Sequence, residues 1–281
     1  MLAFHAHCQM GNQMFIYACA RSLAKKRKLA YCLSELTYLK YFELAGTDKF
    51  NRLKFLAFKV QNKIPGFNYR FEHLQDNRLD YSVQMADEKS TRLWYYGYFQ
   101  GERYLFNNRE DIKKCFQIKQ EYQLPFNDFY TQTFQQKRII VVQIRLKDYK
   151  TFGPEFLDGP DLTLPFSYYR SNIEKLIAEQ PDQHYQLVFM SDDMAEVRKE
   201  FGNYKQAYFS EQSVIIDFQL LQHAHAAVIS PSSYAWWACW LSKVKDPQII
   251  VPAYFLGFRV KQEFPVHMIP GHFIQSEVKL S

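Results

Sequence analysis

The chain alternates short apolar runs with longer amphipathic segments, most regularly in its second half. Short β-branched runs bounded by polar residues predict buried strands, and apolar residues spaced three or four apart predict the helices between them. Strands that alternate with helices predict an α/β fold with a mostly parallel sheet covered on both faces. The strands expected here are 138–145, 185–190, a short strand ending at Tyr208, 226–229 and 249–251, with helices at 165–178, at 214–222 and from Ser233 onward.

The first half has a similar opening but a less readable middle. A strand at 2–7, a helix from Met14 to about Lys28 after the break at Gly11-Asn12, a strand at 30–33, a strand at 93–99 and a helix at 102–115 are expected. Residues 34–90 show no clear period. Residues 117–137 are polar, contain Pro125 and lack apolar periodicity, so we expect them to join two domains, 1–125 and 135–281.

The strand at 138–145 ends in a polar cluster that contains Gln143, Arg145, Lys147 and Asp148. Buried strands of α/β proteins present ligand-contacting residues at their carboxyl ends. A guanidinium at such an end is a planar fork suited to phosphate oxygens. The alternative is an Arg–Asp pair that only pins the strand end, and the residues alone leave the two about even.

Two further strand ends in this half finish in polar residues, Ser191 to Asp193 and Ser230 to Ser233, in which Asp192, Asp193, Ser232 and Ser233 are the candidate ligand contacts. In a parallel sheet the three ends lie on one edge, so they can converge on one ligand. The aspartates could accept hydrogen bonds from a ribose or a guanine edge, and the serines could hold a phosphate at a helix start. Helix capping is the alternative for each of them.

The opening Gly11-Asn12 offers a weaker signal. A glycine turn ahead of a helix N-terminus exposes backbone N–H groups that suit an anion. A single glycine is weak evidence for an anion site, and a plain tight turn is the favoured interpretation on these residues alone.

Composition narrows the class of protein. With 281 residues, 47% of them apolar, the chain can bury one large core or two modest ones. A net charge of +6 suits an anionic small ligand or transient contact with an anionic surface, but not a nucleic-acid footprint. Five widely spaced cysteines support neither a disulfide framework nor a zinc site, and favour a reduced, cytoplasmic protein.

Membrane insertion and metal binding find no support. No signal peptide opens the chain, and no run of 18 apolar residues predicts a transmembrane helix. The pairs His5/His7 and His223/His225 each share a strand face, but no third ligand is evident, so no metal site is expected.

Five segments together resemble glycosyltransferase family 11, the α-1,2-fucosyltransferases. Residues 11–24 resemble the GGLGNQMFQYAxARxLA opening of that family, and 95–105 resemble its GYWQSxKYF segment. Residues 141–149, VVQIRLKDY, resemble HxRRGDY, while 230–241 resemble SNSSFSWWxAWL. FMSDD at 189–193 matches the FSDD element. The matches keep their order and spacing over nearly the whole chain.

This resemblance implies a GT-B fold, with two Rossmann-like domains that face a cleft. Domain 1–125 would be the acceptor side, and 135–281 would bind GDP-fucose. The implied activity is that of an inverting galactoside α-1,2-fucosyltransferase, which moves fucose to a hydroxyl, expected to be O2, of a galactose-terminated glycan without a metal. Arg145 would hold the β-phosphate of the donor. The other implied donor contacts are Gly11, Asn12, Gln143, Asp192, Asp193, Ser232 and Ser233.

Four positions depart from the family pattern: Gln143 replaces its His, Leu146 its second Arg, Lys147 its Gly, and Pro231 its Asn. These changes leave open an α-1,6 or other GDP-sugar-dependent transferase, or a degenerate relative that binds glycan or nucleotide without turnover. Asp148 and Glu155 follow the motif strand, and both are candidates for the base that deprotonates the acceptor. Family analogy places the protein in the cytoplasm, with possible peripheral contact with the inner membrane.

Overall fold

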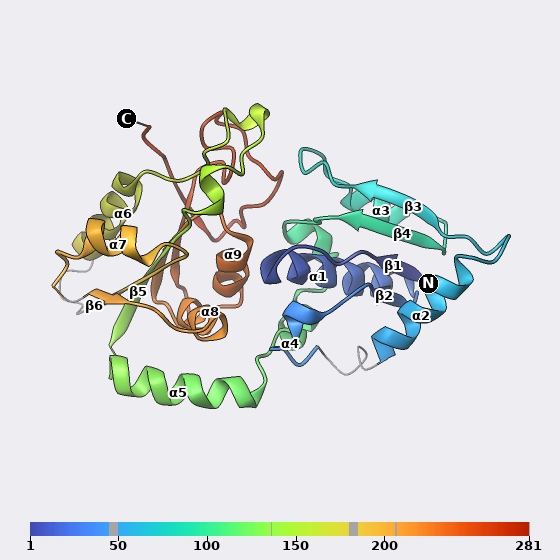
Figure 1. Cartoon of the computed structure of the whole chain (residues 1–281), viewed down its shortest axis with the longest axis horizontal. Coiled ribbons are helices and arrows are strands. Elements are labelled where there is room, and N and C mark those ends of the chain that lie inside the picture. The colour runs from blue at the N-terminus through green and yellow to red at the C-terminus, as the bar shows by residue number, and fades with distance from the viewer. Residues whose placement is uncertain (45–49, 136, 180–184, 206, 281) are drawn as a thin grey trace. The chain divides into compact units, whose positions relative to one another are not determined.

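The computed structural model describes residues 1–44, 50–135, 137–179, 185–205 and 207–280. The chain divides into two compact units. Unit 1 comprises residues 1–119 and 265–268, and unit 2 comprises 120–264 and 269–281. Each unit has its own parallel sheet flanked by helices, which confirms the expected α/β class (Figure 1).

Unit 1 is built on a four-stranded sheet in the order β2-β1-β4-β3, in which every pair of neighbours is parallel. The strands are β1 (Leu2–Phe4), β2 (Tyr31–Leu33), β3 (Arg70–Leu74) and β4 (Leu93–Gly97). The helices are α1 (Met10–Arg27), α2 (Asn51–Gln61), α3 (Ser82–Asp87) and α4 (Arg109–Cys115), with 3-10 turns η1 (Thr37–Leu39) and η3 (Glu102–Leu105). Of these elements, η1, α2, β3 and α3 lie in the stretch whose pattern could not be interpreted.

Helix α1 begins earlier than its sequence pattern predicts. Gly11 and Asn12 lie inside its first turn, and the bend that precedes the helix contains Cys8 with a φ of 61°. The expectation of a glycine turn ahead of the helix is therefore wrong. Three basic residues in the last turn, Lys25 to Arg27, complement the helix dipole.

The helix expected at 102–115 is broken into two pieces. Phe106 and Asn107 adopt left-handed backbone conformations, with φ values of 46° and 62°, and separate η3 from α4. Two consecutive left-handed residues cannot continue a right-handed helix. The expected single helix is thus wrong in its continuity, although both halves are helical.

Unit 2 has a six-stranded sheet in the order β10-β9-β8-β5-β6-β7, again parallel throughout its described pairs. The strands are β5 (Arg138–Ile144), β6 (Tyr185–Ser191), β7 (Ala207–Phe209), β8 (Ala226–Ile229), β9 (Gln248–Pro252) and β10 (Ile274–Ser276). The helices are α5 (Gln120–Phe134), α6 (Phe166–Glu179), α7 (Met194–Phe201), α8 (Val214–Gln222) and α9 (Ser233–Trp240), with 3-10 turns η4 (Asp148–Lys150) and η5 (Glu155–Leu157). Strand β10 was not expected.

Helix α5 occupies most of the segment 117–137, which was expected to join two domains and whose sequence shows no clear apolar periodicity. Its aromatic residues recur at helical spacing, and Phe126 and Phe134 are buried. The Phe126 ring lies 4.8 Å from that of His223, and the Phe134 ring 5.4 Å from that of Tyr208. Pro125 and the polar residues between the rings conceal this apolar stripe in the sequence, which is why no helix was predicted there.

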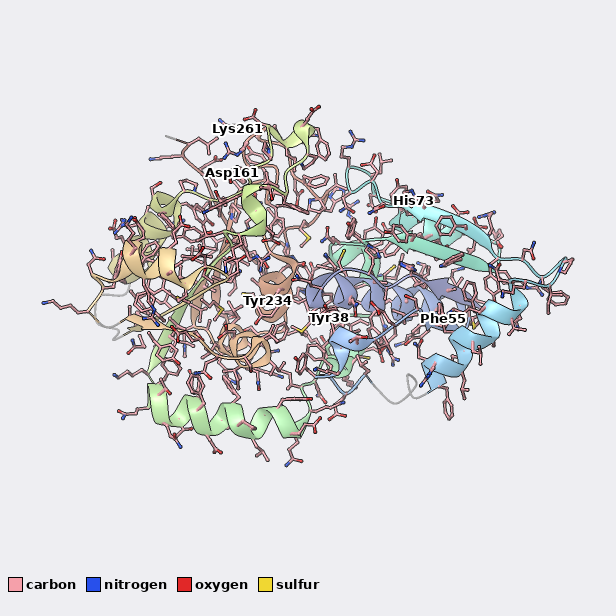
Figure 2. All side chains as sticks on the ribbon, viewed as in Figure 1. Tyr38, Phe55, His73, Asp161, Tyr234 and Lys261 are labelled. Atoms are coloured by element: carbon pink, nitrogen blue, oxygen red, sulfur yellow. The ribbon has the colours of Figure 1, made fainter. Side chains whose placement is uncertain are left out.

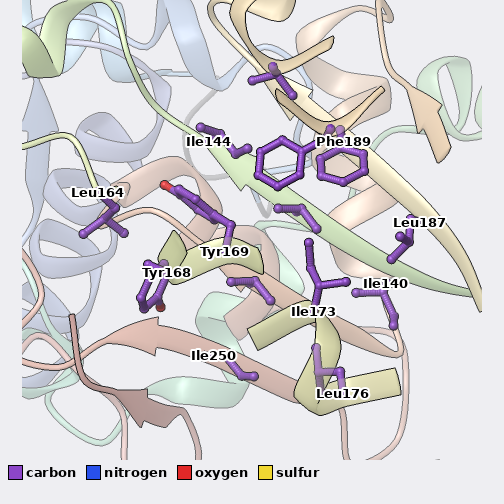
Figure 3. Close-up of a cluster of buried hydrophobic side chains, with 14 of the residues drawn as sticks. Ile140, Ile144, Leu164, Tyr168, Tyr169, Ile173, Leu176, Leu187, Phe189 and Ile250 are labelled. Atoms are coloured by element: carbon purple, nitrogen blue, oxygen red, sulfur yellow. The ribbon is translucent and has the colours of Figure 1, made fainter. Parts of the chain in front are cut away.

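Strand β5 lies at the centre of the unit 2 sheet, with one face packed in the core. Alternate residues Ile140, Val142 and Ile144 are fully buried against α6 and α7, where they meet Tyr169 and Ile173 (Figure 3). Strand β5 comes first along the chain among these strands, yet it lies between β8 and β6. The order of strands therefore reverses at β5, and ligands of open α/β sheets bind at the carboxyl ends of such switch points.

Candidate functional site in unit 2

Arg145 is the first residue beyond β5 and is tied by its backbone to one neighbouring strand. Its amide N–H donates to Ser230 Oγ, 2.8 Å away, just after β8. The next amide, of Leu146, donates to Asp192 Oδ1 at 2.9 Å, just after β6. The structure thus confirms that three polar strand ends meet at one edge of the sheet.

The side chain of Arg145 lies between two carboxylates. Its Nη2 is 2.7 and 2.6 Å from the two oxygens of Asp148, and its Nε is 3.4 Å from Asp192 Oδ2. Burial alone lowers the pKa of this guanidinium, but the charges of Asp192 and Asp148 outweigh burial and raise it. Arg145 is therefore a permanent cation at the switch point, and it also forms the Arg–Asp pair that the sequence left as an alternative.

Ser230 joins the ends of β8 and β5 and also contacts α6, in an arrangement that the sequence did not reveal. Besides accepting from Arg145, its hydroxyl lies 2.6 Å from the hydroxyl of Tyr169 and 3.2 Å from the carbonyl oxygen of Gln143. Nearby, the Tyr149 hydroxyl donates to the carbonyl oxygen of Pro231 at 2.7 Å. Being the first polar residue after its strand was the available signal for Ser230. Tyr149 ends the segment that resembles HxRRGDY, whereas Tyr169 carries no such signal.

Two of the residues predicted to contact the ligand, Asp193 and Ser232, cap helices in the structure. Asp193 is the N-cap of α7 and accepts from the Glu196 amide at 3.3 Å. Ser232 is the N-cap of α9 and accepts from the Ala235 amide at 3.4 Å. Ser233 is the first residue of α9. These residues lie at the same edge as Arg145, but their described bonds are those of helix caps.

The altered motif positions have distinct environments. Gln143 is buried, and its Oε1 has no hydrogen-bond partner among the described residues. Leu146, which stands at the position of the motif's second Arg, is 3% exposed and packs in the unit 2 core beside Leu164. A cation could not occupy that apolar site without losing its hydration, so this position belongs to the core of unit 2.

Of the two candidate bases, Asp148 is bonded to Arg145, whereas Glu155 has no described side-chain partner. It lies exposed on η5, and its carboxylate forms no hydrogen bond or ion pair with the described residues. Its loop folds back tightly, because a Cβ at Gly153 would meet the carbonyl oxygen of Gly159 at 2.2 Å. Farther along this loop, Asp161 accepts from Arg259 Nε at 2.8 Å through its carbonyl oxygen (Figure 2).

Gly11 and Asn12 belong to unit 1. Gly11 is buried, and the Asn12 side-chain oxygen accepts from Gln100 Nε2 at 2.9 Å.

The histidines considered for metal binding have other contacts: His5 and His7 stack on one another, and His223 bonds the carbonyl oxygen of Gln219. Within the described parts of the chain, no group of three or more His, Cys, Asp or Glu is placed to hold a metal.

Solved structures with this fold include several fucosyltransferases. NodZ α-1,6-fucosyltransferase co-crystallised with GDP has a TM-score of 0.57 at 15% identity, with 88% of this chain and 93% of that chain covered. POFUT1 in complex with GDP-fucose has a TM-score of 0.52 at 11% identity, with 85% and 93% covered. Arabidopsis thaliana FUT1 in complex with GDP has a TM-score of 0.53 at 12% identity, with 88% and 69% covered.

At these identities the likeness shows a shared fold, the GT-B type implied by the motifs. No curated protein matches the sequence. The sequence model of the family described as Glycosyl transferase family 11 matches residues 1–263. The chain therefore belongs to glycosyl transferase family 11.

Proposed function

We propose that the protein is an inverting fucosyltransferase that transfers fucose from GDP-fucose to a hydroxyl, O2, of a terminal galactoside. The observation that carries this proposal is Arg145, a cation held at the carboxyl end of β5 where the strand order reverses. Membership of the family supports it, as does the fold shared with NodZ and POFUT1, whose structures contain GDP or GDP-fucose.

In this reaction the bond from the fucose C1 to the β-phosphate oxygen breaks, and a bond from C1 to the acceptor oxygen forms on the opposite face. Negative charge develops on the departing diphosphate, and the guanidinium of Arg145 stabilises it there. The acceptor hydroxyl loses its proton to a base as it attacks. Because Arg145 supplies the positive charge, we propose that no metal is required.

Asp148 and the diphosphate would compete for the same nitrogen. Nη2 of Arg145 donates to both oxygens of Asp148, so a phosphate oxygen that bonds this nitrogen must displace one of them. Asp148 thereby neutralises the guanidinium until a donor binds. Asp192, whose Oδ2 is 3.4 Å from Nε, holds the side chain in place.

The same geometry favours Glu155 over Asp148 as the base. Inversion requires the acceptor to approach the face of fucose opposite the leaving group. A carboxylate bonded to the phosphate-binding nitrogen of Arg145 lies on the leaving-group side. Glu155 is exposed and has no described partner, so its carboxylate is available to an acceptor hydroxyl.

Unit 1 offers a ring surface suited to the acceptor sugar. Tyr96 stacks on His73 at 5.3 Å and on His7 at 4.7 Å, and lies 5.1 Å from His5. These rings come from three adjacent parallel strands or from the residues that follow them, near their carboxyl ends, and His73 is exposed (Figure 2). Aromatic faces pack against the C–H face of a pyranose, while imidazole and phenol groups can bond its hydroxyls. We propose that these rings bind the galactoside.

Two rivals each have an observation in their favour. NodZ, which shares the fold, is an α-1,6-fucosyltransferase, so another linkage is the first alternative. The buried Leu146 and the neutral Gln143 favour the second, a relative that binds nucleotide or glycan without turnover.

The deciding experiment incubates the purified protein with GDP-fucose and a panel of β-galactosides, in EDTA and separately with Mn²⁺, and maps the product linkage by NMR. We expect an O2-linked product in EDTA. An O6-linked product would support the first rival. GDP binding without transfer or donor hydrolysis would support the second.

The role of Arg145 is tested by Arg145→Ala, with Arg145→Lys as the matched variant. We expect turnover to fall by a factor of about 10² to 10³ in the alanine variant, as for loss of one donor that stabilises transition-state charge. The lysine variant, which keeps the charge but not the fork, should lose less. Unchanged turnover in Arg145→Ala would overturn the proposed phosphate role.

A further inference from the structure

Helix α2 is docked on unit 1 by one of its faces. Phe58 on this face is 3% exposed and packs against Tyr69 and Trp94, with ring centroids 4.8 and 5.4 Å apart. At its N-terminus the Asn51 side chain donates to the Leu33 carbonyl oxygen and accepts from its amide, at 2.9 and 2.8 Å. These contacts fix which side of the helix faces the protein.

The opposite face of α2 exposes a second apolar stripe. Leu53, Leu56 and Val60, spaced three and four residues apart, are 64%, 58% and 56% exposed. The residues that extend this stripe at both ends are Phe50, Ile64 and Phe67, at 60%, 44% and 47%. Large apolar side chains this exposed, gathered on one short stretch, mark an interaction surface.

The charged residues of this segment are all basic. Arg52, Lys54, Lys59 and Lys63 lie between and beside its apolar residues, and residues 50–71 contain no Asp or Glu. Lys59 Nζ lies 4.9 Å from the Phe55 ring, so its stem runs along the helix flank. Apolar residues bordered by lysine and arginine are typical of helices that lie in the interface of an anionic bilayer.

We propose that residues 50–67 form a docking surface for an anionic lipid bilayer, in which α2 lies parallel to the membrane plane. The apolar stripe enters the acyl boundary and the basic flanks meet lipid phosphates. A second copy of the chain fits this surface less well, because a symmetric contact would bring the same basic residues together. Among the described residues no helix is long and apolar enough to cross a membrane, and α2 has 11 residues. The inference rests on α2 alone and does not depend on the proposed transfer reaction.

The test is co-sedimentation of the purified chain with vesicles of phosphatidylcholine, with or without one quarter phosphatidylglycerol. We expect binding to the anionic vesicles that weakens with salt. Leu53→Ser with Leu56→Ser should reduce partitioning by about tenfold or more. Arg52→Gln with Lys59→Gln should reduce it by several-fold and flatten the salt dependence.

The matched control is Leu79→Ser with Val83→Ser, two unit 1 side chains that are 53% and 68% exposed. This control should bind vesicles like the parent chain. Thermal melts should show that the α2 variants remain folded. Failure of the parent chain to bind anionic vesicles, or an equal loss in the control, would overturn the proposal. So would a dimer in sedimentation velocity that Leu53→Ser with Leu56→Ser dissociates, because the occupant would then be a second copy.

Discussion

One guanidinium nitrogen of Arg145, Nη2, donates to both carboxylate oxygens of Asp148, at 2.7 and 2.6 Å. A diphosphate that binds this nitrogen must displace Asp148 and also meets its negative charge. Asp148→Asn should therefore bind GDP more tightly, by about 1.5- to fivefold for a pair whose carboxylate is half-exposed. Isothermal titration calorimetry measures the change.

Asp158→Asn is the control for this prediction, because Asp158 is an exposed carboxylate on the same loop. It should leave GDP affinity nearly unchanged. Weaker binding of GDP by Asp148→Asn would show instead that Asp148 orients the guanidinium for the phosphate.

Glu155→Gln tests the proposed base. Loss of a general base lowers turnover by about 10² to 10⁴. Because Glu155 is exposed and makes no described polar contact, the substitution should leave stability and GDP affinity unchanged. Steady-state kinetics with saturating GDP-fucose and acceptor measure the change in kcat. If kcat falls by less than threefold, Glu155 is not the base, and a largely dissociative transfer with little need of one becomes the better account.

The sequence predicted the meeting of Arg145, Asp192 and the 230–233 segment because parallel strands place their carboxyl ends on one edge whatever their order. It did not predict which of these residues bond each other. Ser230, rather than Ser232 or Ser233, joins the two strand ends, since its hydroxyl lies level with the Arg145 amide across β5 and β8. That register is a tertiary property.

Unit 1 shows a different limit. Helix α2 escaped detection because its apolar residues lie on two opposite faces, so that no single stripe of period 3.6 is visible. Helix α5 was missed because Pro125 suggested a break. In both helices the aromatic residues carried the signal, at spacings of three and four.

We expect Gln143 to lower the stability of the fold while it contributes to GDP-fucose binding. Its buried Oε1 has no partner, and such an unsatisfied atom costs about 1–3 kcal/mol. Gln143→Met keeps the volume and removes the atom, so it should raise the free energy of unfolding by about 1 kcal/mol in urea denaturation. If the oxygen accepts from a hydroxyl of the bound donor, GDP-fucose affinity should fall several-fold in the same variant.

The matched control is Gln222→Met, since Gln222 Oε1 is likewise buried without a partner. Gln222 bonds the carbonyl oxygen of Leu241, away from Arg145, and its substitution should leave donor affinity unchanged. Equal donor affinity in Gln143→Met and the parent chain would remove Gln143 from the site.

Asp217 should make stability depend on pH. Burial raises the pKa of this carboxyl from 3.8 to about 6, although the Ser210 hydroxyl, which donates to it at 2.5 Å, acts in the opposite direction. The folded state therefore holds the proton more tightly than the unfolded state. The resulting stabilisation is fully present below pH 3.8 and is lost as the pH rises through about 6.

Asp217→Asn lacks this proton equilibrium and is the reference for the parent chain. The difference in free energy of unfolding between the two should change between pH 4 and 7 by up to about 3 kcal/mol, less where solvent screens the charge. Urea denaturation across this range measures it. Parallel curves for the two proteins would contradict the shifted pKa.

Tyr96 should govern acceptor binding without affecting the donor. Its ring contacts His5, His7 and His73, so Tyr96→Ala removes the centre of the proposed sugar-binding surface. The loss of one stacked ring should raise the acceptor KM by about 3- to 15-fold. Tyr96→Phe, which keeps the ring, should change the acceptor KM little.

Tyr38→Ala is the control, because it removes a tyrosine that is 45% exposed elsewhere in unit 1. It should leave the KM values for the acceptor and for GDP-fucose unchanged. Donor hydrolysis in the absence of acceptor shows whether the nucleotide site is intact. A rise in the KM for GDP-fucose instead would mean that these rings bind the nucleobase, because an aromatic stack accepts a purine as readily as a pyranose.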